Sequence, residues 1–171
     1  MLDKSPKLTL RNFIDGEPIS NSFDCGEKQL NNFIHKEVSL YQKERLGITY
    51  LIHLDSELVG FVTISMSEVR TKSMDFNETL KIRPENYPAL QIGQLAIDKK
   101  YQGQGYGKKI IQWCMSQALE YSEEIGCRLL VLNAIPSSVD FYKKNNFKQL
   151  KRQEKRREKT MYQVIPKELF K

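Results

Sequence analysis

The first part of the chain changes from a strand-like to a helix-like spacing of its apolar residues. Alternation over residues 7–14 predicts a first strand. We then expect a helix over about residues 25–45, capped by Asp24 and ended by Gly47. The apolar residues that carry the helical period are Leu30, Phe33, Ile34, Val38 and Tyr41.

Two β-rich runs follow this helix. Residues 49–54 and 58–66 are separated by the polar residues 55–57, which predicts a hairpin. Residues 70–88 are polar and contain Pro84 and Pro88, so we expect an irregular excursion with room for one short helix.

The second half of the chain has the pattern of a strand, a helix and another strand. Residues 89–97 form a near-continuous apolar run of strand length, and residues 128–135 form a second one. Between them, residues 107–125 carry a helical stripe that Gly126 ends. This order predicts a βαβ unit with two parallel strands. A short helix over residues 140–146 and a last antiparallel pair of strands complete the predicted elements.

Composition fits a single domain spanning residues 1–171. Hydrophobic residues make up 40% of the chain, which is enough to build a core. No apolar run approaches the length of a membrane span, and the first residues lack the apolar stretch of a signal peptide. We therefore expect a cytoplasmic protein without a membrane partner. The three cysteines have no CxxC spacing, so neither a disulfide framework nor a metal site is expected.

Positive charge is concentrated in one segment. The net charge is +6, and residues 148–159 hold seven basic residues against Glu154 and Glu158. Such a segment favours an anionic partner.

Three glycines alternate in QGQGYG, residues 102–107, and Lys108 and Lys109 follow at once. A glycine-rich turn between a strand and a helix exposes backbone N–H groups at the positive end of the helix dipole, which predicts a phosphate site. The spacing fails the P-loop pattern GxxxxGK[ST] and the dinucleotide pattern GxGxxG.

Two segments resemble motifs of the GNAT superfamily of N-acetyltransferases. LAIDKKYQGQGYGKKII (residues 95–111) is similar to its motif A, and DFYKKNNF (residues 140–147) is similar to its FYxxxGF signature, with Asn146 in place of the glycine. FDCG (residues 23–26) and GFVTIS (residues 60–65) are similar to segments of the tRNA-acetylating toxin branch.

The resemblance implies an α/β GNAT fold with a mixed, mostly antiparallel sheet of roughly six to seven strands. A central splayed parallel pair, flanked by helices, belongs to this fold. The resemblance also implies acetyl-CoA as the acetyl donor.

Backbone N–H groups of residues 103–108 are expected to hold the pyrophosphate of acetyl-CoA. Strand residues 95–97 are expected to pair with the pantetheine arm and to polarise the thioester carbonyl. Asn133 is either a further pantetheine contact or the residue that ends a strand. The full set of implied cofactor-binding residues is Leu95, Ala96, Ile97, Gln102, Gly103, Gln104, Gly105, Tyr106, Gly107, Lys108 and Asn133.

Tyr142 matches the family's general acid, the group that protonates the departing thiolate. A phenol can do this once the thiolate is poorly solvated, and the alternative is that Tyr142 only packs against Phe141. Glu68, Asp98 and His53 are candidate bases, and none is favoured. An α-amino group, with a pKa of about 7.7–8.0, depends less on a base than lysine does.

The toxin branch implies the α-amine of an aminoacyl-tRNA as acceptor, a ribbon-helix-helix antitoxin as partner, and a homodimer. We expect residues 148–159 to contact RNA phosphates, with help from four basic residues of the polar excursion. These four are Arg70, Lys72, Lys81 and Arg83. Two alternatives stay open: an acetyltransferase for a small amine or a protein N-terminus, and a non-catalytic module that binds acetyl-CoA or RNA.

Overall fold

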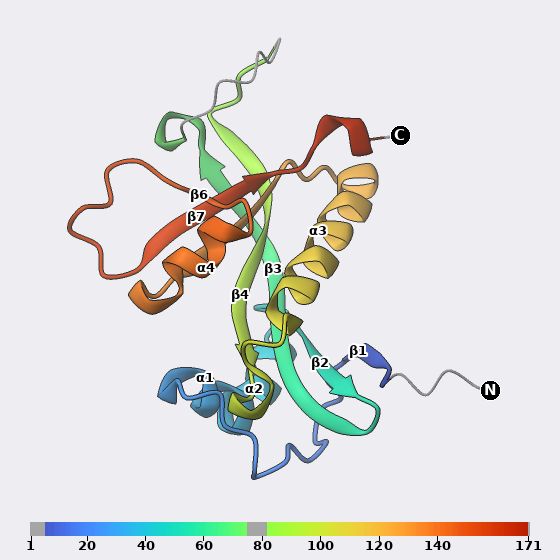
Figure 1. The fold of residues 1–171 in the computed structure, drawn as a ribbon. Helices are drawn as coiled ribbons and strands as arrows, with labels where there is room; N and C mark the ends of the chain where they lie inside the picture. Colours follow the sequence, from blue (N-terminus) through green and yellow to red (C-terminus); the bar gives the residue numbers. More distant parts are fainter. Residues whose placement is uncertain (1–5, 75–81, 171) are drawn as a thin grey trace. The chain divides into compact units, whose positions relative to one another are not determined.

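Seven strands form one sheet, in the order β1-β2-β3-β4-β5-β7-β6, in the computed structural model, which describes residues 6–74 and 82–170 (Figure 1). The strands are β1 (Leu8–Asn12), β2 (Ile48–Leu54), β3 (Glu57–Arg70), β4 (Asn86–Ile97), β5 (Leu129–Ala134), β6 (Lys148–Gln149) and β7 (Lys159–Val164). The pairs β1–β2, β2–β3, β5–β7 and β6–β7 are antiparallel, and β4 pairs with β5 in parallel. The predicted mixed, mostly antiparallel sheet is confirmed.

Helices connect several of these strands. They are α1 (Lys28–Asn32), the π-helical η1 (Phe33–Glu37), α2 (Val38–Lys43), α3 (Tyr106–Glu124) and α4 (Val139–Lys144). Short 3-10 turns are η2 (Thr71–Ser73), η3 (Lys99–Tyr101), η4 (Pro136–Ser138) and η5 (Lys167–Leu169). Within the described ranges, no helix is long and apolar enough to cross a membrane.

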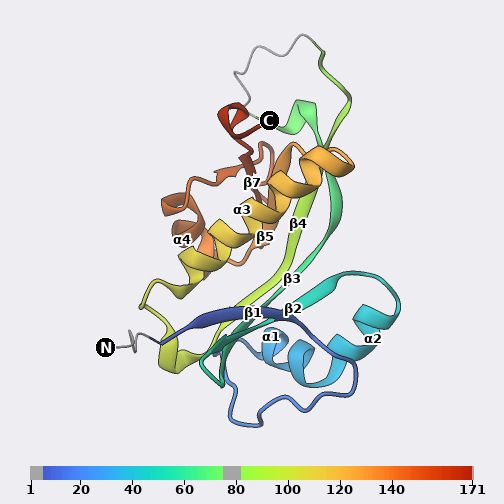
Figure 2. The same ribbon diagram turned by 90° about the vertical axis from the view of Figure 1, so that its right-hand side faces the viewer.

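The chain forms two units, each with an apolar core. The first unit comprises Met1–Ser65 and Gly93–Ile110, and the second comprises Met66–Ile92 and Ile111–Lys171. Figure 2 shows α1 and α2 of the first unit beside β1 and β2. Their core includes Phe33, Ile34, Val38, Leu51 and Phe61. The core of the second unit includes Val69, Tyr87, Leu129, Val131 and Tyr162.

The first helix begins at Lys28 instead of near residue 25, so the prediction of Asp24 as its N-cap is wrong. The Asp24 carboxylate instead stabilises the turn that precedes the helix. It accepts hydrogen bonds from the Gly26 N–H at 2.8 Å and from the Asn31 side chain at 2.7 Å. Local bonding of this kind is typical of aspartate outside helices.

The prediction that Gly47 ends the helix is also wrong. Arg45, with a φ of 57°, is the left-handed residue after α2. A Cβ on Gly47 would lie 2.9 Å from Thr63 Cγ2, so a close side-chain contact accounts for this glycine.

The predicted hairpin of β2 and β3 is confirmed, but β3 continues to Arg70. Its last residues alternate between exposed positions and positions that are buried or half-buried. Several of these residues are polar, so the sequence analysis did not assign them to the strand. The turn η2 supplies the short helix of the polar excursion. Lys81 lies outside the described residues.

The predicted βαβ unit is confirmed by β4, α3 and β5. The parallel register runs from Ala89↔Leu129 to Ile92↔Leu132, and β4 continues through residues 93–97. Gly126, with a φ of 80°, follows the end of α3.

Gly60 permits a close approach of two backbone segments within the first unit. A Cβ at this position would lie 2.5 Å from the Ala96 carbonyl oxygen and 2.9 Å from Ile97 Cδ1. A backbone carbonyl cannot move aside as a flexible side chain can, so glycine is required here.

We predict that Gly60→Ala lowers the free energy of unfolding by about 1–3 kcal/mol, because the new methyl group must displace the Ala96 backbone. Gly93→Ala is the matched control, since its Cβ comes no closer than 3.7 Å to another group, the Thr63 carbonyl. The control should change stability by less than about 1 kcal/mol. Denaturant unfolding measures both, and equal losses would contradict this account of Gly60.

Candidate functional site

Residues 102–107 lead into α3 and include its first two residues, and we call them the glycine turn. Two left-handed glycines shape this turn. Gly103 has a φ of 74° and Gly105 a φ of 86°, a conformation that other residues rarely adopt. A Cβ on either would meet no atom within 4 Å, so backbone conformation and not crowding requires glycine. Gly107 is the second residue of α3. The turn is exposed, and the first N–H groups of α3 have no intrahelical acceptor, which suits an anion.

Basic side chains add positive charge to this end of α3. Lys108 and Lys109 are exposed, and the first turn of α3 contains no acidic residue. The Lys109 Nζ lies 5.6 Å from the centre of the Tyr106 ring, and Tyr101 meets the same ring edge-on at 6.1 Å. The residues present therefore fit the phosphates of a nucleotide donor.

Two predicted site residues use their side chains to brace the loop. Gln102 Nε2 donates to the carbonyl oxygens of Cys25 at 2.9 Å and Ile97 at 2.8 Å. Gln104 Nε2 donates to the Lys100 carbonyl at 2.8 Å. With these amides engaged, the backbone of the two residues is the part left to contact a ligand.

Asp98, a candidate base, is a buried structural carboxylate. One oxygen accepts the Asp24 N–H at 3.0 Å and the other accepts the Lys100 N–H at 2.9 Å. Lys99 Nζ lies 2.8 Å from the Asp24 carboxylate. The Lys99 ammonium, with hydrogen bonds from Asn31 and Gly26, lowers the pKa of Asp24 to about 2. Sequence analysis missed this link between the two turns.

Residues 95–97, which are predicted to contact pantetheine, have mostly buried side chains. Ala96 and Ile97 are buried, and Leu95 is half-buried. Ala96 belongs to the first unit's core. The side chains of Ala96 and Ile97 are therefore not open to a ligand, and the pantetheine contact of this strand stays a prediction.

Tyr142, in the second unit, is buried on α4 among aromatic rings. Its ring centre lies 5.1 Å from that of Phe141 and 5.6 Å from that of Phe147, both edge-on. Burial, with a smaller effect of Cys114, raises the pKa of Tyr142 well above its ordinary value. The phenol is therefore protonated at neutral pH, as a general acid must be. Packing against Phe141 and a role as acid are compatible.

Asn146 stands where the FYxxxGF signature has a glycine. Its φ is 68°, and asparagine tolerates this left-handed conformation better than most residues. The N–H of Asn146 donates to the Lys143 carbonyl at 3.1 Å, and that of Phe147 donates to the Tyr142 carbonyl at 3.0 Å. These bonds form a Schellman motif, and the Tyr142–Phe147 ring contact is its hydrophobic component.

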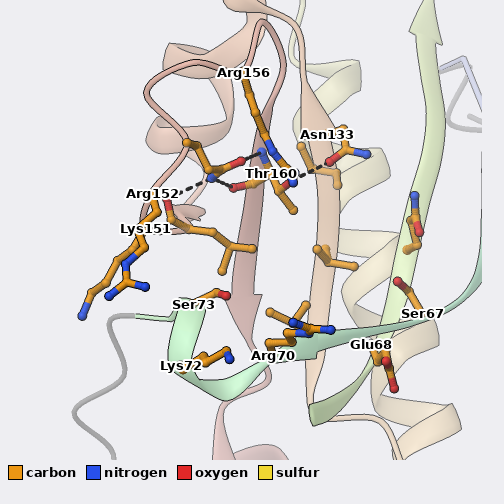
Figure 3. Close-up of a pocket in the computed structure, with 16 residues that line it drawn as sticks. Ser67, Glu68, Arg70, Lys72, Ser73, Asn133, Lys151, Arg152, Arg156 and Thr160 are labelled. Carbon is orange, nitrogen blue, oxygen red and sulfur yellow. Dashed lines mark hydrogen bonds between the residues drawn. The ribbon is translucent and has the colours of Figure 1, made fainter. Parts of the chain in front are cut away.

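A pocket of about 450 Å³ also lies in the second unit (Figure 3). Five basic side chains and one carboxylate, Glu68, line it, and we call it the basic pocket. The basic residues are Arg70, Lys72, Lys151, Arg152 and Arg156. Ser73, Gln153 and Thr160 also line the pocket, although nothing in the sequence singled them out. The excess of positive charge suits a polyanion.

Asn133 is an exposed residue of β5 at the same pocket. Its Oδ1 accepts a hydrogen bond from the Thr160 hydroxyl at 2.8 Å, which Figure 3 marks. Both predicted readings of Asn133 are compatible with its place near the end of the strand.

The two other candidate bases lie in different units. Glu68 lies at the basic pocket, and His53 lies on β2 in the first unit. Burial, and the nearby positive charge of Arg11, lower the pKa of His53. His53 is therefore mainly neutral at pH 7.

A family profile described as an acetyltransferase (GNAT) domain matches residues 45–149. The chain belongs to the GNAT acetyltransferase family. The resemblance found in the sequence is thereby confirmed, and the protein is an acetyl-CoA-dependent N-acetyltransferase.

Two curated relatives have names that describe a toxin or a probable toxin. A "tRNA-acetylating toxin" of Mycobacterium tuberculosis (strain ATCC 25618 / H37Rv) is 22% identical over 125 residues, covering 73% of this chain and 74% of its own. A "Probable toxin TacT" of Sinorhizobium fredii (strain NBRC 101917 / NGR234) is 25% identical over 120 residues, covering 67% and 65%.

Solved toxin structures share the GNAT fold over nearly the whole chain. A tyrosine-to-phenylalanine mutant of KacT has a TM-score of 0.80 at 26% identity, covering 95% of this chain and 96% of its own. AtaT complexed with acetyl-methionyl-tRNAfMet has a TM-score of 0.81 at 24% identity, covering 92% and 95%.

We predict that Gly105→Glu weakens acetyl-CoA binding by about a hundredfold or more, because it strains the turn and adds negative charge where the phosphates are expected. Gly126→Glu is the matched control, with a similar φ of 80° and equally open surroundings. Isothermal titration with acetyl-CoA measures both variants. If the Gly105→Glu variant binds acetyl-CoA as tightly as the wild type, the phosphates do not bind at this turn.

Proposed function

We propose that this protein acetylates the α-amine of an aminoacyl-tRNA. The observation that carries the proposal is the basic pocket, which lies in the same unit as Tyr142 and has five basic side chains against one carboxylate. Neutralising phosphates with Lys and Arg supplies most of the affinity of proteins for nucleic acids. A small uncharged amine would gain nothing from such a surface.

The relatives support the same acceptor. One curated relative is named a tRNA-acetylating toxin, and the structural relative AtaT is described in complex with acetyl-methionyl-tRNAfMet. Other structures describe AtaT bound to the C-terminus of the antitoxin AtaR. We extend the proposal to an antitoxin partner of the ribbon-helix-helix type, a homodimer, a single GNAT domain over residues 1–171, and a cytoplasmic location.

Backbone N–H groups of the glycine turn hold the pyrophosphate in this proposal. The backbone of residues 95–97 binds the pantetheine arm, and one of its N–H groups polarises the thioester carbonyl. Acetyl-CoA, when bound, supplies the acetyl thioester.

Tyr142 gives its proton to the thiolate that leaves as the amine nitrogen forms the new amide bond. The amine loses one proton to water in this scheme, and the Tyr142 phenolate regains one proton from water, so the enzyme returns to its starting state. An α-amino group with a pKa of about 7.7–8.0 is partly neutral at pH 7.5, so a dedicated base is unnecessary. Asp98 is buried and each of its oxygens accepts a backbone N–H, so we assign it a structural role in this proposal.

Transfer of labelled acetyl from acetyl-CoA to a pool of charged tRNA tests the proposal. We predict label on charged tRNA and none on deacylated tRNA. Tyr142→Phe should lower turnover by about a hundredfold or more, because the proton donor is lost, and leave acetyl-CoA affinity nearly unchanged. Tyr121→Phe, a half-buried tyrosine on α3, is the matched control and should keep full activity.

Failure of transfer to every charged tRNA, with acetyl-CoA still bound tightly, would contradict the proposed acceptor. The small amine and the protein N-terminus would then become the acceptors to test. Full turnover by Tyr142→Phe would place the acid elsewhere.

A further inference from the structure

A single buried polar side chain organises the loop between β6 and β7. Gln153 is only 4% exposed, although the residues on either side of it are fully on the surface. Its Nε2 donates to the carbonyl oxygens of Leu150 and Thr160, each at 2.9 Å. Its Oε1 accepts the Thr160 N–H at 2.7 Å. The amide thus satisfies three backbone groups on the two sides of the loop.

Further bonds converge on the backbone of the same residue. The Gln153 carbonyl accepts the Arg156 N–H at 3.0 Å and the Lys159 Nζ at 2.6 Å. Lys159 Nζ also donates to the Arg156 carbonyl at 2.7 Å. The backbone positions of Arg156 and its neighbours are therefore set by contacts with Gln153.

The loop is also tied to the turn after β3. The Lys151 N–H donates to the Ser73 carbonyl at 2.9 Å, and Arg152 adopts a φ of 59°. Residues 151 and 152 and residue 156 are the loop's basic contributions to the pocket. Gln153 lies between residues 152 and 156 in the chain, and its side chain bonds to Leu150 and Thr160 on the two sides of the loop.

A neutral amide has a physical advantage in this position. Like charges in one short loop repel and favour extended conformations. A lysine or arginine at the centre would add to that repulsion, and a carboxylate would cancel part of the positive charge. Glutamine closes the loop by hydrogen bonds and leaves the charge of the pocket intact.

We propose that Gln153 is a positioning residue for the RNA acceptor, an inference that rests on the proposed function. It holds Lys151, Arg152 and Arg156 at the pocket before RNA arrives, so that binding does not bear the cost of ordering the loop. Gln153 itself touches neither acetyl-CoA nor the reacting atoms. Its loss should therefore affect acceptor binding and leave donor binding and the chemical step intact.

The test compares Gln153→Met, which keeps the side-chain length but removes all three bonds, with the wild type. We predict that the KM for charged tRNA, and its Kd in equilibrium binding, rise about tenfold, the usual scale for lost buried hydrogen bonds. The kcat should stay within about twofold, and the Kd for acetyl-CoA should not change. Gln112→Met, at an exposed glutamine on α3 outside the basic segment, is the matched control and should bind tRNA normally.

Hydrogen exchange gives a readout that does not depend on acetylation. The amide of Thr160, which donates to the Gln153 side chain, should exchange faster in Gln153→Met than in Gln112→Met. Unchanged exchange, an unchanged tRNA Kd, or an equal loss of acetyl-CoA affinity would each overturn the role of Gln153. A wild-type protein that binds charged tRNA but transfers no acetyl would instead refute the proposed function.

Discussion

The buried carboxylate of Asp98 joins two turns that lie 74 positions apart in the sequence. It accepts one N–H from the turn at Asp24 and one from Lys100, at the start of the segment that leads to the glycine turn. Gln102 adds bonds to the Cys25 and Ile97 carbonyls on either side of this link. Left-handed glycines give the chain freedom to form the glycine turn, but this freedom carries an entropic cost on folding. The hydrogen bonds of Asp98 and Gln102 supply the constraint that selects one conformation.

In the second unit, residues other than glycine adopt left-handed conformations that hydrogen bonds stabilise. Asn146 takes a left-handed conformation that closes α4 and packs Phe147 on the ring of Tyr142. Arg152 takes another in the loop that Gln153 organises. In each case backbone hydrogen bonds stabilise the segment that carries a candidate site residue, either the buried phenol of Tyr142 or the exposed cations of the loop. Rigid support of this kind allows a charged pocket to be ready for an anion.

The sequence predicted most of the fold and singled out several residues of the candidate site. Gly103 and Gly105 stood out because glycine is rarely repeated without a conformational reason, and the basic stretch stood out by composition. The roles of Asp98 and Gln153 could not be predicted, because their partners are backbone N–H and carbonyl groups that any residue could supply. Local rules also failed at the first helix. Asp24 looked like a helix cap, but its carboxylate bonds to Gly26 and Asn31 in the preceding turn and to the distant Lys99.

The most direct test is the affinity of Asp98→Asn for acetyl-CoA, measured by isothermal titration on folded protein. The amide cannot accept both N–H groups, so the glycine turn should lose order, and the Kd should rise by about tenfold or more. Asp55→Asn is the matched control, because among the described residues Asp55 accepts a single backbone N–H, from Lys7, in an exposed turn of the same unit. An unchanged Kd in Asp98→Asn would contradict the claim that this carboxylate shapes the site for acetyl-CoA.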